Sequence, residues 1–134
     1  MDLIQLIFCD DVRREYINNI AQRSEENIFC QKEIVDRFAV PKNELVVDIG
    51  SNVGVLLQGF KDAGMRVLGV DPAEIPAGKA NANGIVTIVD YFTKNIAKDI
   101  AAKYGSAGVI TGTNVFAHLH ELDDAVEGMK MLLA

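Results

Sequence analysis

Cysteine is scarce in this chain of 134 residues, and the spacing of its two cysteines argues against a disulfide framework and against a structural zinc site. Cys9 and Cys30 lie far apart in the sequence and belong to no C-x-x-C pair, so they fit reduced thiols better than a disulfide framework. A structural zinc site needs more ligands at closer spacing, and the two histidines, His118 and His120, do not supply them. We therefore expect no metal.

Clusters of lysine and arginine are also missing, and the formal net charge is −6. Proteins that bind the phosphate backbone of nucleic acids carry a basic patch, so no nucleic-acid partner is expected. No apolar run approaches the roughly 20 residues that a membrane-spanning helix needs. The N-terminus, MDLIQLIFCDD, lacks the basic start of a secretory signal. These absences predict a cytoplasmic protein without a membrane partner.

What is present is the composition of an ordinary globular domain, with 49% hydrophobic and 24% charged residues. The length fits one domain over residues 1–134. Apolar residues recur at helical spacing from Val12 to Phe38, and Pro41 ends that region. We expect a helical N-terminal segment over residues 10–40, followed by a core over residues 44–134.

From residue 44 onward, short β-branched runs alternate with amphipathic stretches. The runs predict buried strands at Glu44–Ile49, Arg66–Val70, Ile85–Val89 and Gly108–Thr113. The stretches predict helices at Val53–Ala63, Glu74–Asn81, Thr93–Lys103 and Leu122–Leu133. This alternation indicates an α/β fold: a Rossmann-like parallel sheet with helices on both faces, truncated after about four strands.

The turn after the first predicted strand reads DIGSNVG over residues 48–54. Gly50 allows a sharp turn and close approach of a ligand to the backbone, and Gly54 allows close packing at the start of the next helix. Asn52 tolerates unusual backbone angles and could cap that helix. Ligands of open parallel sheets bind beyond the carboxyl ends of the strands. Gly50, Ser51, Asn52 and Gly54 are therefore candidate cofactor-binding residues.

The charge of Asp48, two residues before Gly50, bears on which ligand the turn holds. A dinucleotide fingerprint reads G-x-G-x-x-G and binds a pyrophosphate, whereas this turn reads G-x-x-x-G beside a carboxylate. A carboxylate repels a pyrophosphate but accepts hydrogen bonds from the ammonium of a cationic ligand such as S-adenosylmethionine. Asp48 is thus a candidate cofactor-binding residue.

A second carboxylate ends the second predicted strand, in Asp71-Pro72. Asp71 follows Gly50 by 21 residues, close to the roughly 20-residue spacing of a carboxylate that binds ribose hydroxyls. One carboxylate can accept from two neighbouring hydroxyls. Pro72 then stiffens the turn over the ribose.

Two long stretches, DIGSNVGVLLQGFKDAGMRVLGVDPAEIPAGKANANGIVTIVDYF and GTNVFAHLHELDDAVEGMKMLL, resemble class I S-adenosylmethionine-dependent methyltransferases. Within that class they are most similar to the sugar C-methyltransferase group. The resemblance covers residues 44–133 and implies S-adenosyl-L-methionine as the cofactor. The chain departs from the group at Val53, where an acid is common, and it lacks the group's N-terminal cysteine-rich zinc module and the C-terminal part of its sheet.

The resemblance also implies roles for residues near the third and fourth strands. Asp90, Tyr91 and Phe92 would flank the adenine, although a strand end with a core Phe92 and a solvated Asp90 explains them equally well. Asn114 would face the methyl group, and its alternative is a cap for the following turn.

His118 is the candidate general base, since histidine is the usual base near neutral pH. The alternative is a surface turn before a helix whose acidic first turn suits the helix dipole.

These features predict a methyltransferase that acts on a small-molecule acceptor. The resemblance implies that this acceptor is a sugar. One alternative is a cofactor-binding module or fragment without independent activity, and another is an NAD-dependent oxidoreductase. A sheet of four strands leaves an edge beside the fourth, through which a homodimer could form.

Overall fold

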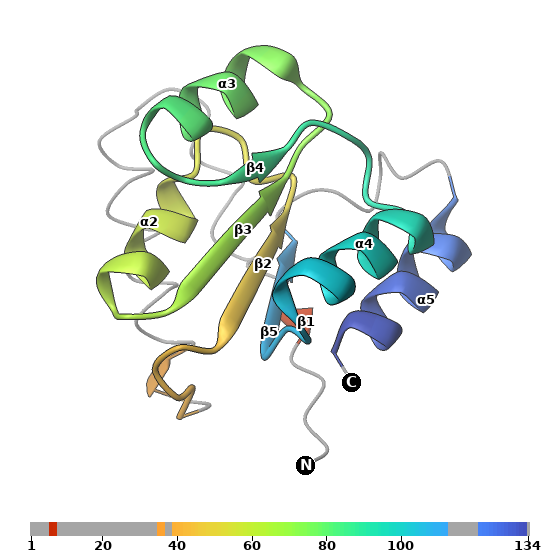
Figure 1. Cartoon of the computed structure of the whole chain (residues 1–134), viewed down its shortest axis with the longest axis horizontal. Coiled ribbons are helices and arrows are strands. Elements are labelled where there is room, and N and C mark those ends of the chain that lie inside the picture. The colour runs from red at the N-terminus through yellow and green to blue at the C-terminus, as the bar shows by residue number, and fades with distance from the viewer. Residues whose placement is uncertain (1–5, 8–34, 37–38, 113–120, 134) are drawn as a thin grey trace, which may run out of the picture.

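A computed structural model describes residues 6–7, 35–36, 39–112 and 121–133 of the chain. Its centre is a parallel sheet of five strands in the order β1-β5-β2-β3-β4 (Figure 1). The strands are β1 (Leu6–Ile7), β2 (Leu45–Ile49), β3 (Arg66–Val70), β4 (Thr87–Ile88) and β5 (Val109–Gly112). The helices between and after them are α2 (Val55–Asp62), α3 (Glu74–Ala82), α4 (Lys94–Tyr104) and α5 (Leu122–Leu132).

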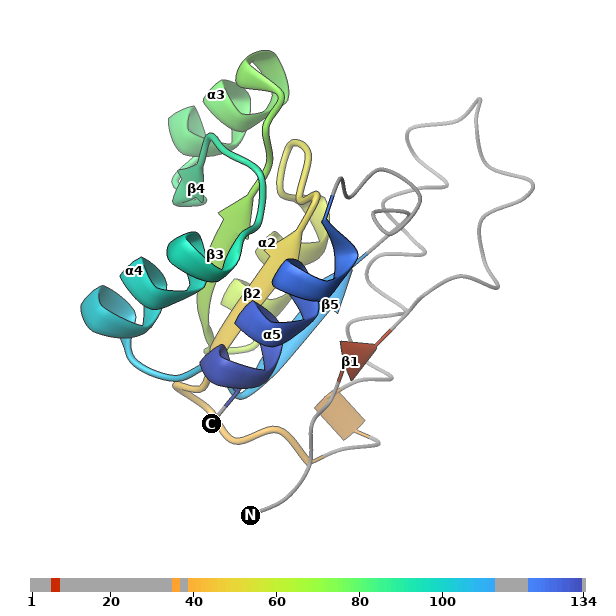
Figure 2. The same ribbon diagram turned by 90° about the vertical axis from the view of Figure 1, so that its right-hand side faces the viewer.

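Helices cover both faces of the sheet, as the sequence predicts. Figure 2 shows α4 and α5 packed on one face and α2 on the other. The first face buries alternate strand residues, among them Val47, Ile49 and Ile110, against α4 and α5. The second face buries Val46 and Val109 against α2 and α3. Because both faces are covered, all five residues of β2 are buried and the strand is apolar apart from one residue.

The boundaries of the central elements lie close to the predicted ones, with β4 as the main difference. The sequence predicts a strand from Ile85 to Val89, but only Thr87 and Ile88 pair with β3. The backbone N–H of Ile85 instead donates to Ala80 O at 2.9 Å and closes the turn after α3. The prediction that Asn52 caps the following helix is also wrong, because α2 begins after Gly54 and has no side-chain cap.

The N-terminal part of the chain contributes a strand that the sequence pattern does not predict. β1 pairs in parallel with β5, with Leu6 opposite Ile110 and Ile7 opposite Thr111. The edge that we expected to be free is therefore covered by the chain itself. Of the predicted helical segment 10–40, the described residues include Val35 and Asp36, which are helical, and the rest lies largely outside the described part.

No helix in the described parts of the chain is long and apolar enough to cross a membrane.

Candidate functional site

The loop between β2 and α2 folds as the tight glycine turn that the sequence predicts. Gly50 (φ 74°), Asn52 (φ 54°) and Gly54 (φ 85°) all take positive φ angles. Glycine adopts this region freely and asparagine better than most other residues, which explains the residue types at these positions. A Cβ on Gly54 would also lie 3.0 Å from Cγ2 of Ile85. The turn lies beyond the carboxyl end of β2, where open parallel sheets bind ligands (Figure 2).

Asp71 ties the glycine turn to the turn that follows β3. One carboxylate oxygen accepts from the backbone N–H of Asn52 at 2.8 Å, and the other accepts from the backbone N–H of Ala73 at 2.8 Å. The residue is 8% exposed. Each carboxylate oxygen has two lone-pair directions, so acceptor capacity remains for hydroxyl groups of a ligand. Pro72, next in the chain, is exposed.

Asp48 lies beneath the glycine turn, buried in the sheet. Its side chain alternates with those of Val47 and Ile49 and therefore points to the α2 face. Oδ1 accepts from the hydroxyl of Thr111, its register partner on β5, at 2.7 Å. Asp48 is only 2% exposed, so it lies under the turn rather than at its surface.

Asp48 and Thr111 belong to a row of register partners that crosses four strands. The row runs from Thr111 on β5 through Asp48 on β2 and Gly69 on β3 to Thr87 on β4. A Cβ on Gly69 would overlap the side chain of Ser51, whose Cβ is 2.9 Å from that position. Gly69 thus leaves the space in which Ser51 sits. The sequence analysis did not identify Gly69 or Thr111, although a glycine inside a strand often marks such a close approach.

These residues fit a small cationic ligand. Two carboxylates, Asp48 and Asp71, lie at adjacent strand ends below and beside the turn. The hydroxyl of Ser51 is buried in the space over Gly69 and has no hydrogen-bond partner in the described part of the chain. The turn carries no side chain at Gly50, so a ligand can reach its backbone there, whereas the Cβ position of Gly54 faces Ile85.

The three residues predicted to flank the adenine lie in the loop after β4 and differ in burial. Asp90 and Tyr91 are exposed, and an oxygen of Asp90 accepts from the N–H of Tyr91 at 2.7 Å. Phe92 is 3% exposed and packs in the core beneath α4 and α5. Phe92 therefore has the core position that the sequence left open as an alternative. Asn114 and His118 lie outside the described residues.

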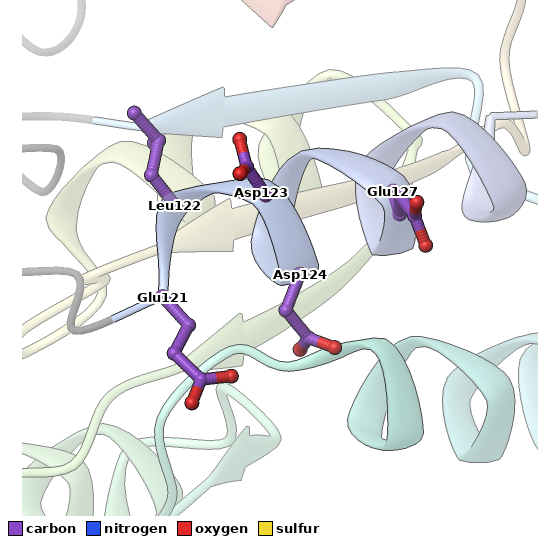
Figure 3. A pocket seen from close by; sticks show the side chains of 5 residues that line it. All are labelled: Glu121, Leu122, Asp123, Asp124 and Glu127. Atoms are coloured by element: carbon purple, nitrogen blue, oxygen red, sulfur yellow. The ribbon is translucent and has the colours of Figure 1, made fainter.

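A separate concavity of about 540 Å³ lies at the start of α5. Figure 3 shows its lining, which is acidic except for one leucine: Glu121, Leu122, Asp123, Asp124 and Glu127. Two of these acids have partners on α4. Asp124 accepts from the backbone N–H of Lys94 at 2.8 Å, and Glu127 pairs with Nζ of Lys94 at 3.1 Å. The acids thus hold α5 against the start of α4.

Comparison with known proteins identifies the family. A family model described as a methyltransferase domain matches residues 19–134. The C-methyltransferase NovU of Streptomyces niveus is 41% identical over 100 residues, which cover 75% of this chain and 24% of NovU. The chain therefore spans about a quarter of the length of this curated relative.

Solved structures support the fold. Magnesium protoporphyrin IX methyltransferase from Synechocystis PCC 6803, with bound SAM, has a TM-score of 0.60 at 19% identity, over 85% of this chain and 59% of that one. The plantazolicin methyltransferase BamL, in complex with a triazolic desmethylPZN analog and SAH, has a TM-score of 0.64 at 18% identity, over 83% of this chain and 42% of that one. The family match covers the whole described sheet from β2 onward, and the chain belongs to the methyltransferase domain family.

Proposed function

We propose that this chain forms the cofactor-binding part of an S-adenosylmethionine-dependent methyltransferase that acts on a small-molecule acceptor of the sugar class. The observation that carries the proposal is the glycine turn, which Asp71 holds from the side and Asp48 underlies. The curated relative is a C-methyltransferase, which supports a carbon as the atom methylated.

Different residues of this site would bind different parts of the cofactor. The carboxylate of Asp71 would accept from the ribose hydroxyls while its bonds to Asn52 and Ala73 keep the turn in shape. Asp48 would supply the negative charge for the methionine end from beneath the turn, and Gly50 would let that end approach the backbone. Asp90 and Tyr91 are the exposed candidates for the adenine.

Catalysis by such a site is mainly positioning. S-adenosylmethionine supplies a methyl group already activated by its sulfonium, so the protein has to hold the donor and acceptor in line. The carboxylates of Asp48 and Asp71 favour the cationic sulfonium of S-adenosylmethionine over the neutral sulfur of the product, S-adenosylhomocysteine. We propose His118 as the general base and Asn114 as a residue near the methyl group.

The alternative is a cofactor-binding module that has no activity of its own. It is favoured by the share of NovU that the chain spans, 24%. A chain that binds the cofactor but methylates no acceptor in a broad screen would support it. The family assignment decides against the NAD-dependent oxidoreductase, which shares the fold.

Calorimetric titration with S-adenosylhomocysteine tests the proposal. The full chain should bind it, and Asp71→Ala should lose most of the affinity together with most of the thermal stabilisation by the ligand. Asp62→Ala removes an exposed acid near the end of α2 and serves as the charge-matched control, which should bind like the wild type. Binding of NADH without binding of S-adenosylhomocysteine would overturn the proposal.

We further propose that the protein acts in the cytoplasm without nucleic-acid or membrane partners, on the basis of its net charge of −6 and of two cysteines that belong to no C-x-x-C pair. Because β1 already pairs with β5, a homodimer through this side of the sheet would have to form on β1.

A further inference from the structure

Thr111 is placed as a fixed hydrogen-bond donor to the carboxylate under the glycine turn. Its residue is 0% exposed, and its hydroxyl donates to Asp48 Oδ1 at 2.7 Å, within the range of a charge-assisted bond. The two residues are 63 positions apart in sequence and meet through the pairing of β2 with β5. A β-branched side chain in a strand has restricted χ1, so the direction of this donor is set by the backbone.

We propose that Thr111 is a positioning residue for cofactor binding, which acts through Asp48. The hydroxyl holds the Asp48 carboxylate in one orientation beneath the turn, so that its negative charge is in place for the ammonium group of the cofactor's methionine end. This inference rests on the proposed function. It adds a residue within β5 to a site whose other described residues come from β2 and from the turns after β2, β3 and β4.

The position of this bond predicts a selective effect. Asp71, the residue proposed to bind the ribose, has its own partners at Asn52 and Ala73 and shares none with Thr111. Loss of the Thr111 hydroxyl should therefore weaken the binding of ligands that carry the amino-acid end. Binding of the adenosine part should be unchanged.

The experiment compares two ligands on matched variants of the full chain. S-adenosylhomocysteine carries the ammonium group, and 5′-methylthioadenosine has the same adenosine thioether without it. Thr111→Val keeps the side-chain shape and removes the donor, Thr111→Ser restores it, and Thr87→Val removes a buried hydroxyl of the same register row that donates to Ile85 O instead. Dissociation constants are measured by calorimetry and folding by circular dichroism.

We expect Thr111→Val to raise the dissociation constant of S-adenosylhomocysteine by about tenfold, which corresponds to the typical free energy of a hydrogen bond to a charged group. Binding of 5′-methylthioadenosine should stay within about twofold, and Thr111→Ser should recover most of the lost affinity. Thr87→Val should leave the ratio of the two constants unchanged. If Thr111→Val does not fold, Thr111→Cys, whose thiol is a weak donor, takes its place with the same expected result.

If Thr111→Val weakened the binding of both ligands equally, Thr111 would have a general structural role and the inference would be overturned. Unchanged binding of S-adenosylhomocysteine by Thr111→Val would also overturn it. Failure of the wild-type chain to bind S-adenosylhomocysteine would instead overturn the proposed function, and this inference with it. The wild-type titration therefore separates the two failures.

Discussion

At the residue scale, Gly54 combines two constraints that other glycines of the chain meet separately. It has φ 85°, and a Cβ there would lie 3.0 Å from Ile85 Cγ2. Gly84 has φ 83°, but a Cβ would have only the flexible end of Lys61 nearby, at 3.5 Å. Gly78, inside α3, has no neighbour within 4 Å of its Cβ position and no positive φ. The three glycines therefore separate backbone strain from steric contact.

Alanine substitutions at these glycines should have three different effects on stability. Gly54→Ala should lower the free energy of unfolding by about 2 kcal/mol or more, Gly84→Ala by about 1 kcal/mol, and Gly78→Ala should raise it by about 0.5 to 1 kcal/mol. Urea denaturation measures all three. If Gly54→Ala cost no more than Gly84→Ala, the contact with Ile85 would be unimportant.

The residues that the sequence reveals are those with a local signal. Gly50 and Gly54 lie in a recognisable turn, and Asp71 follows a strand at a known spacing. Thr111 gives no such signal, because its role depends on its position opposite Asp48 on a strand 63 residues away. Phe92 shows the reverse case: its aromatic type suits both an adenine contact and a core position, and only the packing separates them.

At the element scale, hydrophobic patterns predict most of the fold because both faces of the sheet are covered. Buried strands such as β2 and β3 show as apolar runs bounded by turns, and their predicted limits agree within a residue. β4 is shorter than predicted, since only Thr87 and Ile88 pair with β3, and the side chain of Asn81 bonds the N–H and the C=O of Thr87, at 2.8 and 3.0 Å, on the edge that faces away from β3. A side chain that replaces backbone partners leaves no trace in hydrophobicity.

The junction of α4 and α5 depends on one of two similar acids. Asp124 and Asp123 both lie in the first turn of α5, where an acid favours the helix dipole. Only Asp124 of these two also accepts, in the described structure, from the first backbone N–H of α4. Figure 3 shows its side chain directed toward α4 and that of Asp123 directed away.

Asp124→Ala should therefore lower the free energy of unfolding by about 1 kcal/mol more than Asp123→Ala, since it removes a helix cap in addition to the dipole effect. Chemical denaturation of the two variants under the same conditions gives the difference. Equal losses would show that the bond to Lys94 contributes nothing beyond the shared charge effect.

At the scale of the whole molecule, β1 decides what the β5 side of the sheet presents to its surroundings. The sequence predicts a free edge there, because a strand of two residues is too short to show a pattern. In the structure, Leu6 and Ile7 pair with the middle of β5, and Val109 and Gly112 flank the paired region. Unpaired edge strands are sites of association, so β1 should protect the chain from pairing with another copy.

Two truncations test this protection. Removal of residues 1–9 deletes β1 and exposes the backbone of β5, so this variant should associate as its concentration rises. Removal of residues 1–5 leaves β1 in place, and this matched control should sediment like the full chain. Sedimentation velocity over a range of concentrations reports the masses. If the two truncations behaved alike, β1 would not be what keeps β5 from pairing, and any homodimer would have to use another surface.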